Sequence, residues 1–228
     1  MEPAATGYPV RMTTFSPFLP PVRRLERDDR LDGVVSGVDT LAERVADSPA
    51  GPALRGEWLG HALHPLLTDF PLGCWLSAGV LDLVGGSSSR KAAQRLVGLG
   101  VAMVPVTAAA GAADYRNIGE RGAKRIGAVH AVGKTVVAML YLMSWRHRRK
   151  GHHARGVLLA LIGGGLAWVT GYLGGHLSFG KGASVEERGD HARMGGVSPV
   201  TRGDMGEPVS PADTMFGQME GVEAPIDA

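Results

Sequence analysis

Histidine, aspartate, tyrosine and lysine residues recur near the ends of several long apolar runs of this chain. They are His61, His64, Asp69, Asp114, Tyr115, His130, Lys134 and His176. Neutral imidazole is the commonest metal ligand in proteins, and helical bundle cores hold metal and haem sites. An ionisable side chain at membrane depth is costly, and it is by itself a reason to expect a functional site.

Four apolar runs have the length of a bilayer span, at about 65–84, 96–113, 126–145 and 156–177. Each approaches the roughly 20 residues that the hydrocarbon core of a membrane requires. The first opens with His64 and Pro65, and proline suits the first position of a helix. We therefore predict an all-α fold: an integral membrane four-helix antiparallel bundle, formed by residues 55–182, with disordered termini.

Antiparallel spans would bring the polar residues to one side of the membrane, because the first and third spans begin where the second and fourth end. We predict a cofactor site there, formed by His64, His130 and His176. The predicted surrounding polar cluster consists of His61, Asp69, Asp114, Tyr115 and Lys134. Lys134 needs an acidic partner, for which Asp69 and Asp114 are the candidates.

Three interpretations of this cluster stay open. The histidines could ligate a b-type haem or a metal ion. The histidines, aspartates and lysine could instead relay protons or bind a small polar ligand. In the third interpretation they are interfacial groups that bond to each other and to lipid headgroups.

Polar segments flank the predicted bundle. Residues 1–54 contain a proline-rich and charged stretch, which we expect to be disordered or loosely attached up to residue 33, and one short amphipathic helix near 34–46. Residues 183–228 form an acidic tail that we also expect to be disordered. The single cysteine, Cys74, excludes a disulfide within one chain. No cleavable signal peptide is evident at the N-terminus.

The distribution of lysine and arginine predicts the orientation. The connections at 85–95 and 146–155 carry eight such residues, and the connection at 116–125 carries four. The positive-inside rule then places the first two connections in the cytoplasm and both termini outside the plasma membrane of a bacterial cell. A basic run beside a span meets anionic lipid, so we expect the bilayer and not nucleic acid as its partner.

The ordered motifs of the chain resemble the domain-of-unknown-function 2231 family, which comprises bacterial four-helix membrane proteins. The resemblance covers roughly residues 55–182 and rests on His64, Pro65, Pro71, Asp82, Asp114, His130, Gly174, Gly175 and His176. It implies a link to electron transfer, because family members are frequently fused to a Rieske iron–sulfur domain. The tail of this chain lacks the Cys-x-His pairs of such a cluster, so a partner oxidoreductase or a separate cofactor is implied.

We therefore predict a membrane redox subunit that binds haem b or a metal at the polar cluster. We expect no catalytic activity of its own, because the sequence contains no Walker, GxSxG, HExxH or Rossmann motif. One alternative is a structural anchor or scaffold for a partner oxidoreductase. Another is a small transporter, which Lys134 and Pro105 at membrane depth suggest, although no convincing internal repeat supports it.

Overall fold

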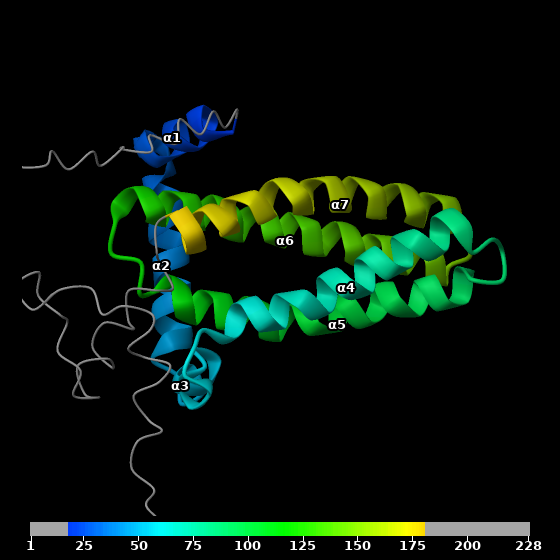
Figure 1. The fold of residues 1–228 in the computed structure, drawn as a ribbon, viewed down its shortest axis with the longest axis horizontal. Coiled ribbons are helices and arrows are strands. Elements are labelled where there is room, and N and C mark those ends of the chain that lie inside the picture. Colours follow the sequence, from blue (N-terminus) through cyan, green and yellow to red (C-terminus); the bar gives the residue numbers. More distant parts are fainter. Residues whose placement is uncertain (1–17, 181–228) are drawn as a thin grey trace, which may run out of the picture. The chain divides into compact units, whose positions relative to one another are not determined.

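The computed structural model describes residues 18–180, and every regular element in that part of the chain is a helix (Figure 1). The longest are α4 (Leu63–Val84), α5 (Arg90–Tyr115), α6 (Arg121–Arg149) and α7 (His153–Gly175), and a π-helical turn, His176–Gly180, follows α7. Four helices of the described part of the chain are long and apolar enough to cross a membrane. The predicted all-α class with four helices of spanning length is confirmed. The predicted tail at 183–228 lies outside the described residues.

The helices extend beyond the apolar runs seen in the sequence. Helix α5 begins at Arg90 and α6 begins at Arg121, each more than one turn before the predicted span. Hydropathy detects only the apolar middle of such a helix, whereas backbone hydrogen bonding continues into the polar ends. Pro71 lies inside α4 and Pro105 inside α5, and both helices continue through the proline.

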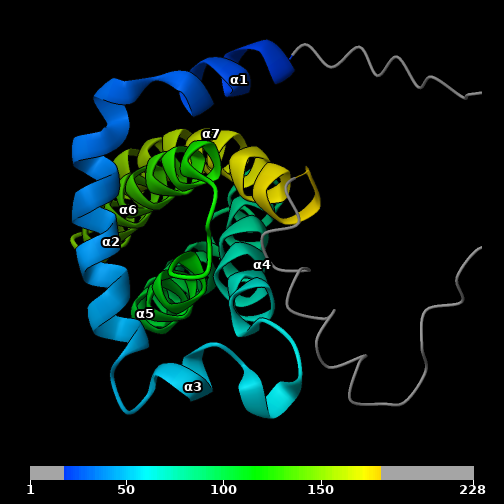
Figure 2. The same cartoon turned by 90° about the vertical axis from the view of Figure 1, so that its left-hand side faces the viewer.

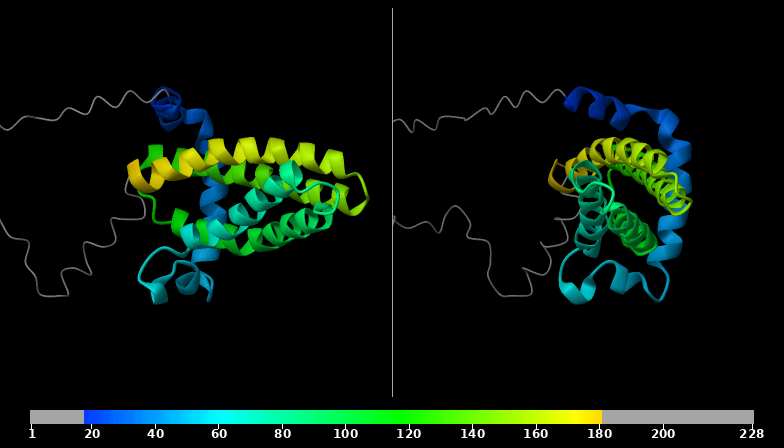
Figure 3. Two further views of the ribbon diagram at one scale, coloured as in Figure 1. Left: turned by 45° about the vertical axis from the view of Figure 1, so that its right-hand side comes forward. Right: turned by 90° about the vertical axis from the view of Figure 1, so that its right-hand side faces the viewer.

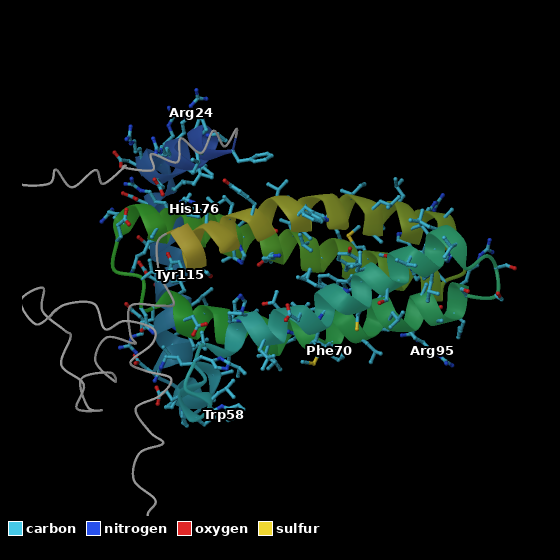
Figure 4. All side chains as sticks on the ribbon, in the orientation of Figure 1. Arg24, Trp58, Phe70, Arg95, Tyr115 and His176 are labelled. Atoms are coloured by element: carbon cyan, nitrogen blue, oxygen red, sulfur yellow. The ribbon has the colours of Figure 1, made fainter. Side chains whose placement is uncertain are left out.

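Large apolar side chains cover the outside of the bundle. Leu76, Leu83 and Trp168 are 72%, 81% and 84% exposed, and Figure 4 shows Phe70 on the outer surface of α4. Soluble monomeric proteins rarely expose continuous apolar surface of this kind. Such a surface suits contact with lipid tails, so the exposure agrees with the spanning length of the helices.

The four long helices form two antiparallel hairpins, α4 with α5 and α6 with α7, and α5 also packs against α6. Figure 2 views the bundle toward the end at which α4 and α6 begin. Helices α4 and α6 run in the same direction, because one helix separates them along the chain. An apolar cluster in the middle of the bundle includes Trp75, Val97, Val137 and Ala167.

Three shorter α-helices of the described chain, α1 (Leu19–Arg27), α2 (Asp32–Ala46) and α3 (Gly51–Leu54), precede the bundle, together with two 3-10 turns, Asp29–Leu31 and Glu57–Leu59. Figures 2 and 3 show them around the ends of the long helices, with α2 lying across the direction of the bundle. We call residues 19–59 the collar, and the end of the bundle beside it the collar end. Helix α2 covers the stretch near 34–46 for which a short amphipathic helix was predicted. Helix α1 shows that residues 19–27, which were expected to be disordered or loosely attached, form a helix: Pro20 and Pro21 start it, and Val22 is buried with 3% exposure. The rest of that expectation, for residues 1–17, lies outside the described residues.

Ion pairs attach the collar to the bundle. They join Asp32 to Arg121 at 2.8 Å and to Arg125 at 2.9 Å, Asp39 to Lys124 at 2.6 Å, Asp29 to Arg125, and Asp47 to Arg116. All four basic residues belong to the connection at 116–125 and the first turns of α6. Hydrogen bonds from Arg125 and Arg121 lower the pKa of Asp32 from 3.8 to about 2. The collar thus carries the counter-charges of this basic connection.

Candidate functional site

Helices α4 and α6 place side chains opposite each other between the two hairpins. The rings of Trp75 and Tyr141 stack with centroids 3.9 Å apart and planes 6° from parallel. Closer to the other end of the bundle, Asp82 on α4 meets Arg148 on α6. These two contacts fix the relative height of α4 and α6.

The Asp82–Arg148 pair is buried, and both charged groups are hydrogen-bonded. The guanidinium donates to the two carboxylate oxygens at 2.8 and 2.5 Å, and the side chains of Arg148 and Asp82 are 1% and 5% exposed. Arg148 Nε also donates to Ser144 Oγ at 3.2 Å, and the Ser144 hydroxyl donates to the carbonyl of Gly156 at 2.6 Å. Sequence analysis matched Asp82 to a family motif but did not find its partner. The arrangement is typical of a structural ion pair, because each charge is already satisfied.

His64 and His130 lie at one level near the collar end. Trp75 follows His64 by eleven residues, and Tyr141 follows His130 by eleven residues. Eleven residues of α-helix span about 17 Å, so each histidine lies about 17 Å along its helix from the stacked rings. Because α4 and α6 run in the same direction, both histidines lie at the same level. The two imidazoles also lie close enough to interact electrostatically. The structure therefore brings these two predicted site residues together.

The two imidazoles make equivalent hydrogen bonds. His64 Nδ1 donates to the carbonyl of Thr107 on α5 at 2.9 Å, and His130 Nδ1 donates to the carbonyl of Thr170 on α7 at 2.8 Å. A carbonyl can only accept, so the proton of each neutral ring is on Nδ1 and the lone pair is on Nε2. Within residues 18–180 no group hydrogen-bonds to either Nε2 atom. Both nitrogens remain available to a ligand.

A glycine makes room for each imidazole. A Cβ atom added at Gly111 would lie 2.8 Å from His64 Cε1, and one added at Gly174 would lie 2.8 Å from His130 Cε1. Gly111 follows Thr107 by four residues, as Gly174 follows Thr170. Each ring is thus held by a carbonyl and a glycine that are one turn apart on the neighbouring helix.

These contacts reveal an internal repeat that sequence analysis missed. In both α4 and α6 a histidine is followed after eleven residues by an aromatic residue and after seven more by a charged residue. The partner helices α5 and α7 repeat as well. Trp75 packs against Gly100, which precedes Thr107 by seven residues, and Tyr141 packs against Gly163, which precedes Thr170 by seven residues. The two hairpins are therefore related by a pseudo-two-fold axis that runs along the bundle.

Comparison with known proteins identifies the family. The model of the family described as "Predicted membrane protein (DUF2231)" matches residues 60–187, more than half of the chain. The chain belongs to this family. No curated protein and no solved structure matches it. The family assignment and the four apolar helices establish a predicted membrane protein, as the sequence indicated.

The matched region of this DUF2231 protein includes His176, which lies apart from the other two histidines. His176 follows Thr170 by six residues, about 9 Å further along α7 toward the collar end. Its Nε2 lies 3.2 Å from Glu26 Oε1 of α1, and Figure 4 shows His176 beside the collar. Sequence analysis grouped His176 with His64 and His130, but it could not foresee a partner from α1.

Other residues of the predicted cluster occupy separate places. His61 is exposed, and its Nδ1 donates to the carbonyl of Ala62 at 3.2 Å. Asp114 lies half-buried in the last turn of α5 beside Tyr115, whose hydroxyl donates to the carbonyl of Lys124 at 3.1 Å. Asp69 is exposed on α4 and has no polar partner among residues 18–180.

Lys134 lies one turn beyond His130 on α6 and is half-buried. Its charge is close enough to act on both His64 and His130. Neither Asp69 nor Asp114 pairs with it, and in the described part of the chain it has no ion pair or hydrogen bond. The expected carboxylate partner is thus not found there. The candidate site comprises His64, His130 and Lys134.

Proposed function

We propose that this protein is a haem b-binding membrane subunit that takes part in electron transfer, and that the imidazoles of His64 and His130 would hold the haem. The observation that carries the proposal is the pair of imidazoles at one level, each fixed through Nδ1 and each with a free Nε2. A hydrogen bond at one ring nitrogen that fixes the orientation and tautomer is a common feature of metal-ligating histidines.

The donor set fits haem better than a metal ion bound by protein alone. Within residues 18–180 no three His, Cys, Asp or Glu side chains gather as metal ligands. Two imidazoles are sufficient for haem, because the porphyrin supplies the other four nitrogens. Gly111 and Gly174 also fit this role, since a side chain at either position would collide with a ligating ring.

Haem bound here would supply one-electron transfer between its ferric and ferrous states. The residues of the chain would hold it from both hairpins, with Thr107 and Thr170 fixing the orientation of the imidazoles. The stacked Trp75 and Tyr141 close the space between α4 and α6 further along the bundle. A separate oxidoreductase would have to exchange electrons with this site, in agreement with the partner that the sequence suggested.

The optical spectrum of the purified full-length protein tests the proposal. We expect a Soret band after expression with ample haem, and we expect its loss in His64→Ala and in His130→Ala. His61→Ala is the matched control, because His61 lies three residues from His64 but is exposed and bonds only to its neighbour. His176→Ala is expected to retain haem, because its imidazole contacts Glu26. A wild-type protein without a Soret band, or full haem content in both His64→Ala and His130→Ala, would contradict the proposal.

The transporter alternative gains little from the internal repeat. Transport would be favoured by broken helices at corresponding places in the two repeats. Pro71 and Pro105 lie only in the first hairpin, and the corresponding residues of the second hairpin are Val137 and Trp168. Both proline-containing helices are continuous.

A further inference from the structure

The pseudo-two-fold axis relates residues of unequal charge at two levels of the bundle. Asp82 corresponds to Arg148, and these two neutralise each other across the axis. Thr68 corresponds to Lys134, since each follows its histidine by four residues. The hydroxyl of Thr68 donates to the carbonyl of His64 at 2.7 Å, so it does not balance the lysine. Among residues 18–180, the level of Lys134 therefore carries a positive charge without a counter-charge.

This charge is next to the two histidines. Lys134 is one turn from His130, and side chains of a helix lean toward its N-terminus, which for α6 is the collar end. The Cα–Cβ bond of Lys134 therefore leans toward the level of the imidazoles, and the lysine charge acts on both His64 and His130. An ammonium group removed from water without a counter-charge is costly, and in membrane helices such groups are normally paired. Within residues 18–180 the protein supplies no such partner.

We propose that Lys134 binds an anionic group, namely a carboxylate, of the molecule held between His64 and His130. This inference rests on the proposed function, and for haem b the carboxylate is a propionate. The two imidazoles are neutral ligands, so Lys134 is the residue of the site that can distinguish a charged ligand from an uncharged one. It is a specificity residue and does not ligate the metal.

Titration of the apoprotein in detergent tests this role with two probes, haem b and its dimethyl ester, which has no free carboxylate. The wild-type protein should prefer haem b. Lys134→Met should weaken binding of haem b about tenfold or more, the typical effect of losing a hydrogen bond to a charged group. The same substitution should leave binding of the ester unchanged. An equal loss for both probes, or no loss for either, would overturn the inference.

The repeat provides a second variant. In Thr68→Lys combined with Lys134→Thr, the lysine moves to the corresponding position across the axis, and preference for haem b should return. A double variant that binds the dimethyl ester normally but does not prefer haem b would contradict the position assigned to the positive charge, at the level of Thr68 and Lys134. These failures differ from failure of the proposed function, in which the wild-type protein binds neither probe.

Discussion

Removal of one charge from the Asp82–Arg148 pair should strongly destabilise the bundle. In Asp82→Asn the guanidinium of Arg148 loses its counter-charge and one of its two oxygen acceptors but stays buried, with only 1% of its side chain exposed. Ser144 remains as a neutral partner for Nε. Breaking a buried ion pair in this way costs about 3–5 kcal/mol. For a chain of this size that corresponds to a fall in Tm of roughly 6–20 °C.

Thermal unfolding of the full chain in detergent, followed by tryptophan fluorescence, measures this effect. Asp69→Asn is the matched control, because it makes the same change on the same helix at an exposed carboxylate without a partner among residues 18–180. Exchanging the two charges, with Arg at position 82 and Asp at 148, should recover part of the loss. A shift for Asp82→Asn no larger than that for Asp69→Asn would refute the assignment of a buried, structurally important pair.

Two further predictions concern the collar and the glycines of α7. The pKa of Asp32 is lowered, so its bonds to Arg121 and Arg125 contribute fully to stability above its ordinary pKa of 3.8 and are lost as the pH falls toward about 2. The amide groups of α2 should therefore lose protection from hydrogen exchange in that interval. Unchanged protection at pH 2 would contradict the role of this carboxylate. Gly174→Ala should destabilise the folded protein by about 1–3 kcal/mol, because the added Cβ meets His130. Gly171→Ala, with open space around the added Cβ, should stabilise it by about 0.5–1 kcal/mol through helix propensity. Tm shifts in the same direction for both variants would count against the close contact at Gly174.

The long helices were predictable because their signal is local. A run of about 20 apolar residues must cross a bilayer as a helix, whatever the rest of the chain does. Helix α1 was missed for the opposite reason, since it has only nine residues and burial against the bundle stabilises it. The sequence shows two prolines and several charges there, and it does not show what Val22 packs against. The orientation in the membrane stays a prediction.

The candidate site was predictable only in part. Alternation of the spans correctly placed His64 and His130 at one end of the bundle. The same reasoning could not separate His176, because its partner Glu26 lies far away in sequence on a helix that was not expected. Asp82 and Arg148 also lie far apart in the chain. The repeated spacing from His64 to Asp82 and from His130 to Arg148 was the available signal for that pair.

The repeat also explains why the two ends of the bundle differ. A duplicated hairpin places equivalent residues on opposite sides of one axis, so a charge in one copy meets its equivalent in the other. At Asp82 and Arg148 the equivalents have opposite charges and are buried together, so these two charges balance each other. At Thr68 and Lys134 the charge lies in one copy alone, one turn from His130. Under the proposal made above, this difference in charge makes the level of Lys134, and not that of Asp82 and Arg148, the one that binds an anionic ligand.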